Sequence, residues 1–248
     1  MLRVIINGYS GSMGKVLTKC VNEDNELQLV CGVSRDELDV TFKTYHKMSE
    51  VEENADIIID FSNHCAIYDV LDYATKTKTP LVIATTGFND EELGAIEKAS
   101  AIIPIFHSSN MSLGVNVLVK LVKDASKALN GFDIEIIEKH HNRKEDCPCG
   151  TAFMTADAIK EVRNELTNIY GRHGKNAKRQ ENELGIHTIR GGTIIGDNDV
   201  IFAGDDEVLE IKHKAGSNMI FAKGAVMAAK FIVNAENGLY DMNDVLLG

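Results

Sequence analysis

The sequence predicts an α/β protein in which a doubly wound parallel sheet is joined to a second, α+β domain with a mixed or antiparallel sheet. Short apolar runs alternate with helical patterns as far as Phe106. A glycine-rich turn directly follows the first of these runs, and beyond residue 184 strand-like segments are separated only by turn sequences. Strand–helix alternation is typical of parallel sheets, whereas strands joined by tight turns are typical of antiparallel ones.

The strands of the first part are expected to be buried, because parallel strands covered by helices are apolar on both faces. Short β-branched runs place them at Arg3–Asn7, Leu27–Val33, Asp56–Asp60, Pro80–Ala84 and Ile102–Phe106. Helical patterns between them cover Met13–Asn22, Ala66–Lys76 and Asp90–Ser100. The third helix has Asn89 and acidic residues at its start, which is typical of a helix N-terminus.

The second part has a different pattern. Helices are predicted over Met111–Leu129, Thr151–Tyr170 and Phe221–Asn234, and Arg172–Glu183 is expected to be a polar, mobile loop. Strands are predicted over Phe132–Glu138, Gly185–Arg190, Thr193–Ile195, Val200–Ala203 and Val208–Lys214. Glycine- and aspartate-rich turns separate the later strands, so this sheet is expected to be antiparallel or mixed.

Composition excludes several classes of protein. The chain has 248 residues and a net charge of −11, whereas nucleic-acid and membrane-surface binding both need a basic face. No apolar run is long enough to span a bilayer, and the N-terminus does not resemble a signal peptide. Five scattered cysteines fit free thiols in a reducing compartment. A cytoplasmic protein is therefore expected, with no nucleic-acid or membrane partner.

The glycine-rich turn predicts a dinucleotide site. Its residues are Gly8, Tyr9, Ser10, Gly11, Ser12, Met13 and Gly14, between the first strand and the first helix. Such a turn brings backbone N–H groups and a helix N-terminus onto a pyrophosphate, as in Rossmann-like sheets. A plain strand–helix turn remains the alternative interpretation.

Polar residues at later strand ends extend this prediction, since ligands of open α/β sheets lie at the carboxyl ends of the strands. Ser34 and Arg35 end the second strand where an acidic residue would bind the ribose of NAD, so NADPH, or use of both NADPH and NADH, is favoured. Asp36 comes slightly later and could still reach the ribose. The expected cofactor edge is completed by Phe61, Ala84, Thr85, Thr86, Ser108, Ser109, Asn110 and Met111.

The segment Glu138–Ala152 carries the candidate catalytic groups. His140 could exchange a proton near neutral pH, and Lys144 could bind an anionic substrate. Gly150 and Thr151 lie at the predicted start of a helix, where N–H groups can bind a carboxylate. An exposed polar loop is the alternative. A zinc site formed by His140, His141, Cys147 and Cys149 is disfavoured, because the Cys-x-Cys spacing is tighter than usual.

Taken with its flanking motifs, this segment resembles the 4-hydroxy-tetrahydrodipicolinate reductase (dihydrodipicolinate reductase) family. The family form is E-x-H-H-x-x-K-x-D-x-P-S-G-T-A. Further matching motifs are Gly8–Gly14, Asp60–Ser62, Thr85–Phe88, Asn110–Asn116, Ile189–Gly192, His213–Ala215, Phe221–Ala225 and Gly238–Met242. The resemblance extends over nearly the whole chain.

The resemblance implies a dinucleotide-binding domain of residues 1–110 and 220–248 and a substrate-binding and oligomerisation domain of residues 111–219. It implies NADPH- or NADH-dependent reduction of 4-hydroxy-tetrahydrodipicolinate, a small dicarboxylate, in lysine and diaminopimelate biosynthesis, by a homotetramer. His140 would be the proton donor and Lys144 the second one, while His141, Cys149, Gly150 and Thr151 would bind substrate. No metal is implied.

Some residues depart from the family pattern. Cys149 replaces the serine of P-S-G-T, Asn218 replaces an arginine, and Ala84 replaces a glycine at the cofactor edge. A thiol is a poorer hydrogen-bond donor than a hydroxyl, so these changes bear on affinity rather than reaction type. Two alternatives remain open: another two-domain NAD(P)-dependent dehydrogenase of the amino-acid type, and a nucleotide- or metal-sensing protein.

Overall fold

A computed structural model describes residues 1–36 and 38–247, which form two compact units. Unit 1 contains residues 1–112 and 218–248, and unit 2 contains residues 113–217. The sequence-based boundaries, 110/111 and 219/220, lie two residues from these. Within the described part of the chain, no helix is long and apolar enough to cross a membrane.

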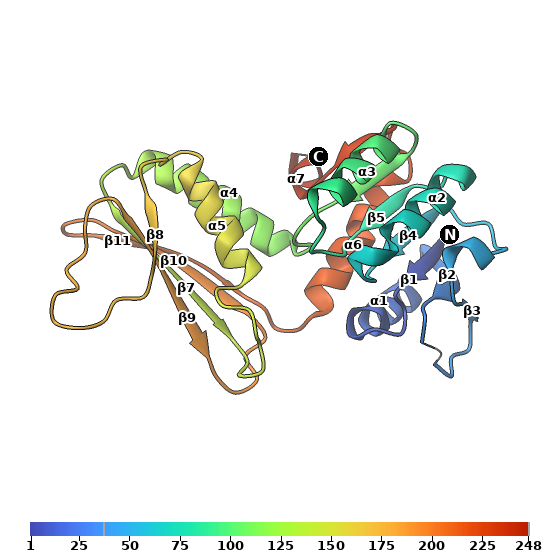
Figure 1. Cartoon of the computed structure of the whole chain (residues 1–248), viewed down its shortest axis with the longest axis horizontal. Helices are drawn as coiled ribbons and strands as arrows, with labels where there is room; N and C mark the ends of the chain where they lie inside the picture. The colour runs from blue at the N-terminus through green and yellow to red at the C-terminus, as the bar shows by residue number, and fades with distance from the viewer. Residues whose placement is uncertain (37, 248) are drawn as a thin grey trace. The chain divides into compact units, whose positions relative to one another are not determined.

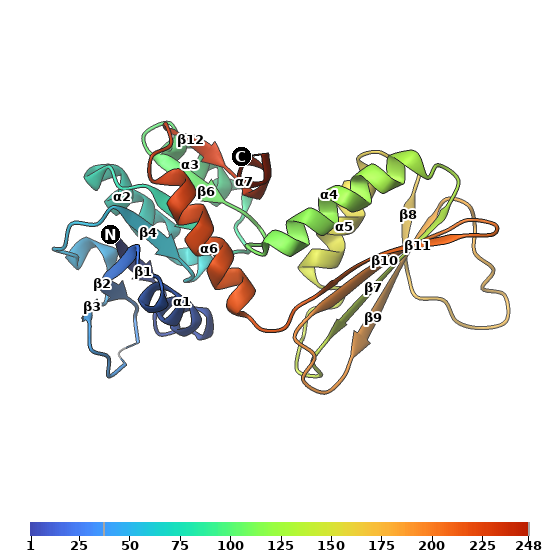
Figure 2. The ribbon, with the colours of Figure 1, turned by 180° about the vertical axis from the view of Figure 1, so that it is seen from behind.

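Unit 1 is built on a seven-stranded parallel sheet with the order β12-β6-β5-β4-β1-β2-β3 (Figures 1 and 2). Its strands are β1 (Leu2–Asn7), β2 (Leu27–Val33), β3 (Lys43–Tyr45), β4 (Ile57–Asp60), β5 (Leu81–Ile83), β6 (Pro104–His107) and β12 (Gly238–Tyr240). The strand order reverses direction between β1 and β4, which is the switch point where open α/β sheets bind ligands. The predicted doubly wound, Rossmann-like sheet is confirmed.

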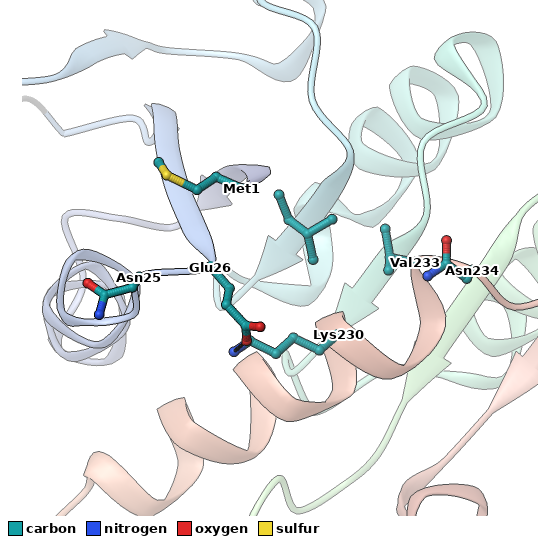
Figure 3. Close-up of a pocket in the computed structure, with 7 residues that line it drawn as sticks. Met1, Asn25, Glu26, Lys230, Val233 and Asn234 are labelled. Carbon is teal, nitrogen blue, oxygen red and sulfur yellow. Dashed lines mark hydrogen bonds and ion pairs between the residues drawn. The ribbon is translucent and has the colours of Figure 1, made fainter.

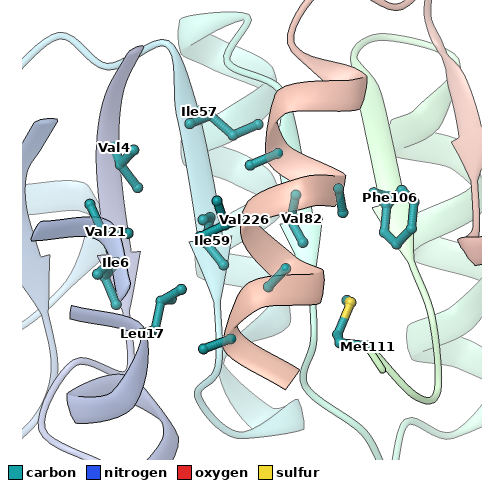
Figure 4. Packing of buried hydrophobic residues seen from close by; sticks show 14 of the residues in the cluster. Val4, Ile6, Leu17, Val21, Ile57, Ile59, Val82, Phe106, Met111 and Val226 are labelled. Atoms are coloured by element: carbon teal, nitrogen blue, oxygen red, sulfur yellow. The ribbon is translucent and has the colours of Figure 1, made fainter. Parts of the chain in front are cut away.

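Helices cover both faces of this sheet. One face carries α1 (Ser12–Glu23) and α6 (Met219–Ile232), and the other carries α2 (Ile67–Thr77) and α3 (Asp90–Ser100). Val4 and Ile6 of β1 pack toward α1 and α6 in the cluster that Figure 4 shows, whereas Ile5 between them packs on the other face. This alternation explains why each strand reads as a continuous apolar run. A short helix, α7 (Met242–Leu247), ends the described chain.

Unit 2 is a five-stranded mixed sheet with helices on one face (Figures 1 and 2). Its strand order is β11-β10-β7-β9-β8; β7 runs parallel to β9 and antiparallel to β10. The strands are β7 (Asp133–His140), β8 (Thr167–Tyr170), β9 (Glu183–Arg190), β10 (Asp197–Ala203) and β11 (Val208–Lys214), and the helices are α4 (Leu113–Ala128) and α5 (Gly150–Lys160). Ile134 and Ile136 of β7 pack with these helices in a common core, because every second side chain of a strand points to the same face of the sheet.

Two predicted elements are wrong. A helix was expected over Thr151–Tyr170, but the observed helix ends at Lys160. The last four residues of the predicted range form β8 instead, because Thr167 and Ile169 pair in register with Glu183 and Gly185. The ladder outweighs local helical propensity there. The strand expected over Thr193–Ile195 is a turn instead, since it lies between Gly192, whose φ is +48°, and Gly196, and has no ladder partner.

The polar segment between β8 and β9 forms a loop, as predicted, and arginines anchor it to the sheet. Arg172 pairs with Glu135 at 2.8 Å and with Glu183 at 2.9 Å. Arg179 pairs with Asp133 at 2.5 Å and donates a second hydrogen bond to Glu135. These contacts lie on the sheet face opposite α4 and α5.

Candidate functional site

The glycine turn lies at the carboxyl end of β1, at the switch point of the parallel sheet. Gly8 has a φ of +85°, and a Cβ at this position would lie 2.4 Å from the carbonyl oxygen of Phe61. A Cβ on Gly14 would lie 2.1 Å from the carbonyl oxygen of Gly8. Both positions therefore require glycine, and Gly11 caps the N-terminus of α1. A turn and a helix N-terminus of this form fit the pyrophosphate of a dinucleotide.

The tip of β2 lies beside this turn. The hydroxyl oxygens of Ser10 and Ser34 are 2.5 Å apart, so a hydrogen bond joins the turn to the second strand. Arg35 and Asp36 follow on the exposed surface, and Ser12 is exposed at the start of α1. An exposed guanidinium next to the turn is better suited to bind a phosphorylated ribose than a ribose without a phosphate.

Tyr9 is buried rather than part of the surface. It is 1% exposed, and its ring packs edge-on against Phe42 with centroids 5.5 Å apart. Its hydroxyl accepts a hydrogen bond from the backbone N–H of Leu38 at 3.4 Å. The side chain therefore holds the segment after β2, and only the backbone of Tyr9 remains to contact a cofactor.

A buried carboxyl group connects three strand ends at the switch point. Asp60 is 1% exposed and accepts hydrogen bonds from Asn7 Nδ2 at 2.7 Å, Ser62 Oγ at 2.6 Å and Thr85 Oγ1 at 2.6 Å. Burial raises the pKa of this carboxyl, which these neutral donors only partly oppose. Thr85 was predicted to contact the cofactor, and this network was not predicted. The only signal for it was a polar residue at each of three neighbouring strand ends.

The predicted strand-end residues divide into three groups. Ser108 and Thr85 are buried: the hydroxyl of Ser108 donates to the carbonyl of Asn110 at 2.9 Å and stabilises its own loop, whereas that of Thr85 binds Asp60. Thr86 is exposed. The others meet at one pocket of about 210 Å³, which is lined by Met13, Phe61, Ala84, Ser109, Asn110, Met111 and Phe221.

This pocket fits the nicotinamide end of a dinucleotide. It lies within unit 1, beside the glycine turn, and combines apolar walls with the polar residues Ser109 and Asn110. Phe221 is the lining residue that sequence analysis missed, because it was identified only as part of the final helix. A larger pocket of about 480 Å³ lies instead at the amino ends of β1 and β2, where Lys230 pairs with Glu26 (Figure 3). Its position, away from the carboxyl edge, does not suit the cofactor.

In unit 2, the end of β7 carries a carboxylate–imidazole pair. His140 Nδ1 lies 2.6 Å from Glu138 Oε2, and Glu138 is fully buried. Arg190 of β9 donates to both carboxylate oxygens of Glu138, at 2.8 and 2.7 Å. Burial raises the pKa of Glu138, but the hydrogen bonds from Arg190 and His140 outweigh it, so the net pKa lies below the ordinary value. The site thus contains a stable anion behind the ring of His140.

The loop after β7 places Lys144 and His141. The backbone N–H of Lys144 donates to the carbonyl of His141 at 3.2 Å, and its ammonium pairs with Asp146 at 2.7 Å. The Lys144 side chain is 24% exposed, so the cation can still be reached from solvent. The Nδ1 atom of His141 is buried and makes no hydrogen bond within the described part of the chain. Such a group is able to bind a polar ligand atom.

The loop ends at the N-terminus of α5. Cys149 is the N-cap, and Gly150 and Thr151 form the first turn of the helix, where the partial positive charge of the helix N-terminus favours an anion. The Cys149 side chain is 3% exposed, and its thiol donates to Asn198 Oδ1 at 3.7 Å. Burial raises the pKa of this thiol. Cys149 therefore stabilises the core, and its backbone is engaged as well, because its N–H donates to Glu138 and its carbonyl accepts from Ala152.

The four residues that were considered for a zinc site do not converge on one point. Among the described residues, the atoms that come close enough to share an ion belong to Glu138, His140 and Cys149, a set that lacks His141 and Cys147. Arg190 already engages both oxygens of Glu138, and the raised pKa keeps the proton on Cys149. This donor set suits hydrogen bonding better than metal binding.

Three contributors to this site were not predicted from the sequence. Arg190 and Asn198 come from β9 and β10, about 50 and 60 residues from His140 in the chain, and a single sequence carries no pairing information over that separation. Gly196 is the third, since a Cβ there would lie 3.0 Å from His140 Nε2. The sequence signal for Arg190 was the Ile189–Gly192 motif, which was noted without a role.

Comparisons with known proteins agree with this geometry. Residues 2–111 match the profile of the family described as dihydrodipicolinate reductase, N-terminus, and residues 114–246 match dihydrodipicolinate reductase, C-terminus. The chain is 52% identical over 247 residues to the 4-hydroxy-tetrahydrodipicolinate reductase of Caldanaerobacter subterraneus subsp. tengcongensis, covering 99% of this chain and 98% of the relative. It is 47% identical to that of Clostridium botulinum, with the same coverage.

A solved structure shares the whole fold. The dipicolinate-bound dihydrodipicolinate reductase from Paenisporosarcina sp. TG-14 superposes with a TM-score of 0.81 at 23% identity, covering 98% of this chain and 99% of that one. At this identity the likeness concerns the fold alone. Both sheets and their connections are therefore those of a known two-domain architecture.

Proposed function

The chain belongs to the dihydrodipicolinate reductase family, and on that premise we propose that it reduces 4-hydroxy-tetrahydrodipicolinate to tetrahydrodipicolinate with NADPH or NADH. The observation that carries this proposal is the end of β7, where a fully buried Glu138 holds both the ring of His140 and the N–H of Cys149 at the start of α5, and where Lys144 follows in the next loop. A proton donor, a cation and helix N–H groups are what a dicarboxylate substrate requires when it is reduced and loses water.

Unit 2 would bind the substrate. We assign the substrate carboxylates to Lys144, His141 and the first turn of α5 at Gly150 and Thr151. Each group is a cation, a hydrogen-bond donor or a helix N-terminus, and all of them stabilise negative charge. His140 would donate the proton that completes the reduction, and Lys144 would be a second proton donor.

Unit 1 would bind the cofactor, which supplies the hydride when bound. The glycine turn at Gly8–Gly14 would hold the pyrophosphate, and the pocket lined by Phe61, Asn110 and Met111 would hold the nicotinamide. Ser34 and the exposed Arg35 favour the ribose phosphate of NADPH. The neutral, apolar lining next to the ring position would keep water from the reacting carbon.

The alternative functions have less support. A dehydrogenase of the amino-acid type would share the cofactor unit but would not need a carboxylate-held histidine followed by a second histidine and a lysine. A metal sensor would need ligands that are not already engaged, and Glu138 is engaged by Arg190.

A homotetramer built through unit 2 is part of this proposal. The helices α4 and α5 cover one sheet face. The opposite face carries the ion pairs of Arg172 and Arg179 and also the exposed apolar side chains of Ile189 and Val208, at 45% and 61%. Exposed apolar side chains among polar groups are common in oligomer interfaces. Light scattering after gel filtration measures the mass of the assembly. We further propose a cytoplasmic location, for which the five free cysteines are suitable.

The test of function is a coupled assay. Enzymatically generated 4-hydroxy-tetrahydrodipicolinate is mixed with the purified chain and either NADPH or NADH, and loss of the reduced cofactor is followed. Turnover with at least one cofactor, and a higher kcat/KM with NADPH, is the expected result. Absence of turnover with both cofactors, from folded protein, would exclude the proposed function.

A further inference from the structure

Glu138 is a charged side chain in a fully buried position, yet it has no place among the substrate groups. It is 0% exposed and lies on the face of β7 that packs against the helices. A buried carboxylate is costly unless every one of its acceptor positions is used. Its hydrogen bonds therefore show what it does.

All four acceptor positions of Glu138 are used by three neighbours. Oε1 accepts from Arg190 Nη2 at 2.7 Å and from the backbone N–H of Cys149 at 3.1 Å. Oε2 accepts from Arg190 Nη1 at 2.8 Å and from His140 Nδ1 at 2.6 Å. No position is left for a substrate atom or an ion, so Glu138 acts only through the groups it holds.

The contact with His140 determines which ring nitrogen carries the proton. An ionised carboxylate only accepts hydrogen bonds, so Nδ1 must be the donor, and proton exchange with a ligand is left to Nε2. Gly196 keeps this edge of the ring uncovered, because a Cβ there would lie 3.0 Å from Nε2. The remaining contact, with Cys149 N–H, fixes the start of α5 relative to the same ring.

We propose that Glu138 is the positioning residue of the site: held by Arg190, it keeps the Nδ1–H tautomer of His140 and aligns the ring with the N-terminus of α5. This inference rests on the proposed function and deepens it. A structural ion pair alone would stabilise unit 2 without controlling the tautomer of His140 or the pH dependence of turnover.

The first test needs no substitution and no activity. In full-length protein labelled with 15N-histidine, long-range proton–nitrogen correlations report the tautomer of each neutral ring, and His140 is identified by the loss of its signal in His140→Gln. We expect neutral His140 to carry its proton on Nδ1. A proton on Nε2 would overturn the proposal, whether or not the chain is a reductase.

The second test is Glu138→Gln. The amide that replaces Oε2 would donate to Nδ1, so the neutral ring would carry its proton on Nε2, the wrong tautomer. We expect kcat to fall at least about tenfold, with KM for NADPH unchanged and the alkaline limb of the pH–rate profile displaced, because a proton donor loses its activity as the pH rises. A kcat within about threefold of the parent, at an unchanged pH profile, would overturn the proposal.

The chain offers a matched control in unit 1. Glu92 is also buried, and its Oε1 lies 2.8 Å from Nδ1 of His64, while Oε2 caps α3 through the N–H of Asn89. Glu92→Gln removes the same kind of carboxylate–imidazole contact and keeps the cap, since glutamine also forms a capping box. Its kcat and pH profile are expected to match those of the parent. If the Glu138→Gln variant does not fold, the measurement of the His140 tautomer in the parent protein still tests the proposal.

Discussion

His140 is the side chain on which the proposed chemistry depends most directly. Its Nδ1 is occupied by Glu138 at 2.6 Å, which leaves one ring nitrogen for the substrate. Replacement by glutamine keeps a polar side chain of similar reach but removes the exchangeable proton. We expect His140→Gln to lower kcat by about two orders of magnitude or more, with little change in KM for NADPH. Steady-state kinetics in the coupled assay measures this, and full turnover by the variant would remove His140 from the mechanism.

Lys144 is expected to act on both binding and rate. Its ammonium pairs with Asp146 and remains partly exposed, so it can pair with a substrate carboxylate. Lys144→Ala should raise KM for the substrate and lower kcat, each about tenfold or more. Lys123→Ala is the control, because Lys123 also pairs with a carboxylate, Glu161, but lies on the outer part of α4. Equal kinetics for the two variants would exclude the assigned role.

The lowered pKa of Glu138 also predicts how the stability of the protein changes in acid. Its folded-state pKa lies below the ordinary value of 4.5, despite burial, because Arg190 and His140 donate to the ionised form. Its stabilising contribution is therefore fully present above about pH 4.5 and is lost as the pH falls through the lower, folded value. The difference in free energy of unfolding between the parent and Glu138→Gln should shrink from pH 6 toward about pH 3. Urea titrations measure this, and a difference that grows toward acid would contradict it.

At the scale of elements, the junction of β1 and α1 depends on close backbone packing. A Cβ at position 14 would lie 2.1 Å from the carbonyl oxygen of Gly8 and 2.6 Å from Tyr9 Cα, and backbone cannot move as a side-chain end can. Gly14→Ala should therefore lower the free energy of unfolding by about 2 kcal/mol or more and weaken NADPH binding. Calorimetry and cofactor titration measure the two effects.

Another helical glycine gives the opposite expectation. Gly94 lies inside α3, and a Cβ there would meet nothing within 4 Å. Gly94→Ala should raise the free energy of unfolding by up to about 1 kcal/mol, because alanine has the higher helix propensity. Similar gains of stability in Gly14→Ala and Gly94→Ala would show that helix propensity, not contact with the turn, controls position 14.

Elements with a strong local signal were predicted well. The long apolar strands of unit 1 and the helix capped by Asn89 and Glu92 have that signal, and the capping box is present. The strands β3 and β12 were missed, because each has three residues and is defined only by pairing with a neighbour. β8 was assigned to a helix for the same reason. Pairing across the chain is tertiary information, which propensity and periodicity do not contain.

The candidate site was predicted to a similar extent. The segment that carries His140, Lys144 and Thr151 is continuous in sequence, so one motif was enough to indicate it. Arg190, Gly196 and Asn198 come to it by strand pairing, and Phe221 reaches the cofactor pocket from the final helix. Some residues that were predicted from the sequence to contact the cofactor or the substrate prove to have buried side chains. The side chains of Tyr9, Thr85, Ser108 and Cys149 face the protein interior, where they hold loops and helix ends.

At the scale of the whole molecule, two units divide the proposed work between them. A seven-stranded parallel sheet carries the proposed cofactor edge, and a five-stranded mixed sheet carries the proposed proton donor and carboxylate-binding groups. Each unit matches its own part of one family, and relatives of about half identity align along nearly the entire chain. The division explains why substitutions in unit 2 are expected to change kcat and substrate KM while leaving NADPH binding intact.

The most direct test of the central claim is a crystal structure of this chain with NADPH and pyridine-2,6-dicarboxylate, a planar dicarboxylate that cannot be reduced. We expect one carboxylate at the first turn of α5, at Gly150 and Thr151, with Lys144 Nζ and His140 Nε2 within hydrogen-bond distance of the ligand. Side chains of His140 and Lys144 directed away from a bound dicarboxylate would contradict it.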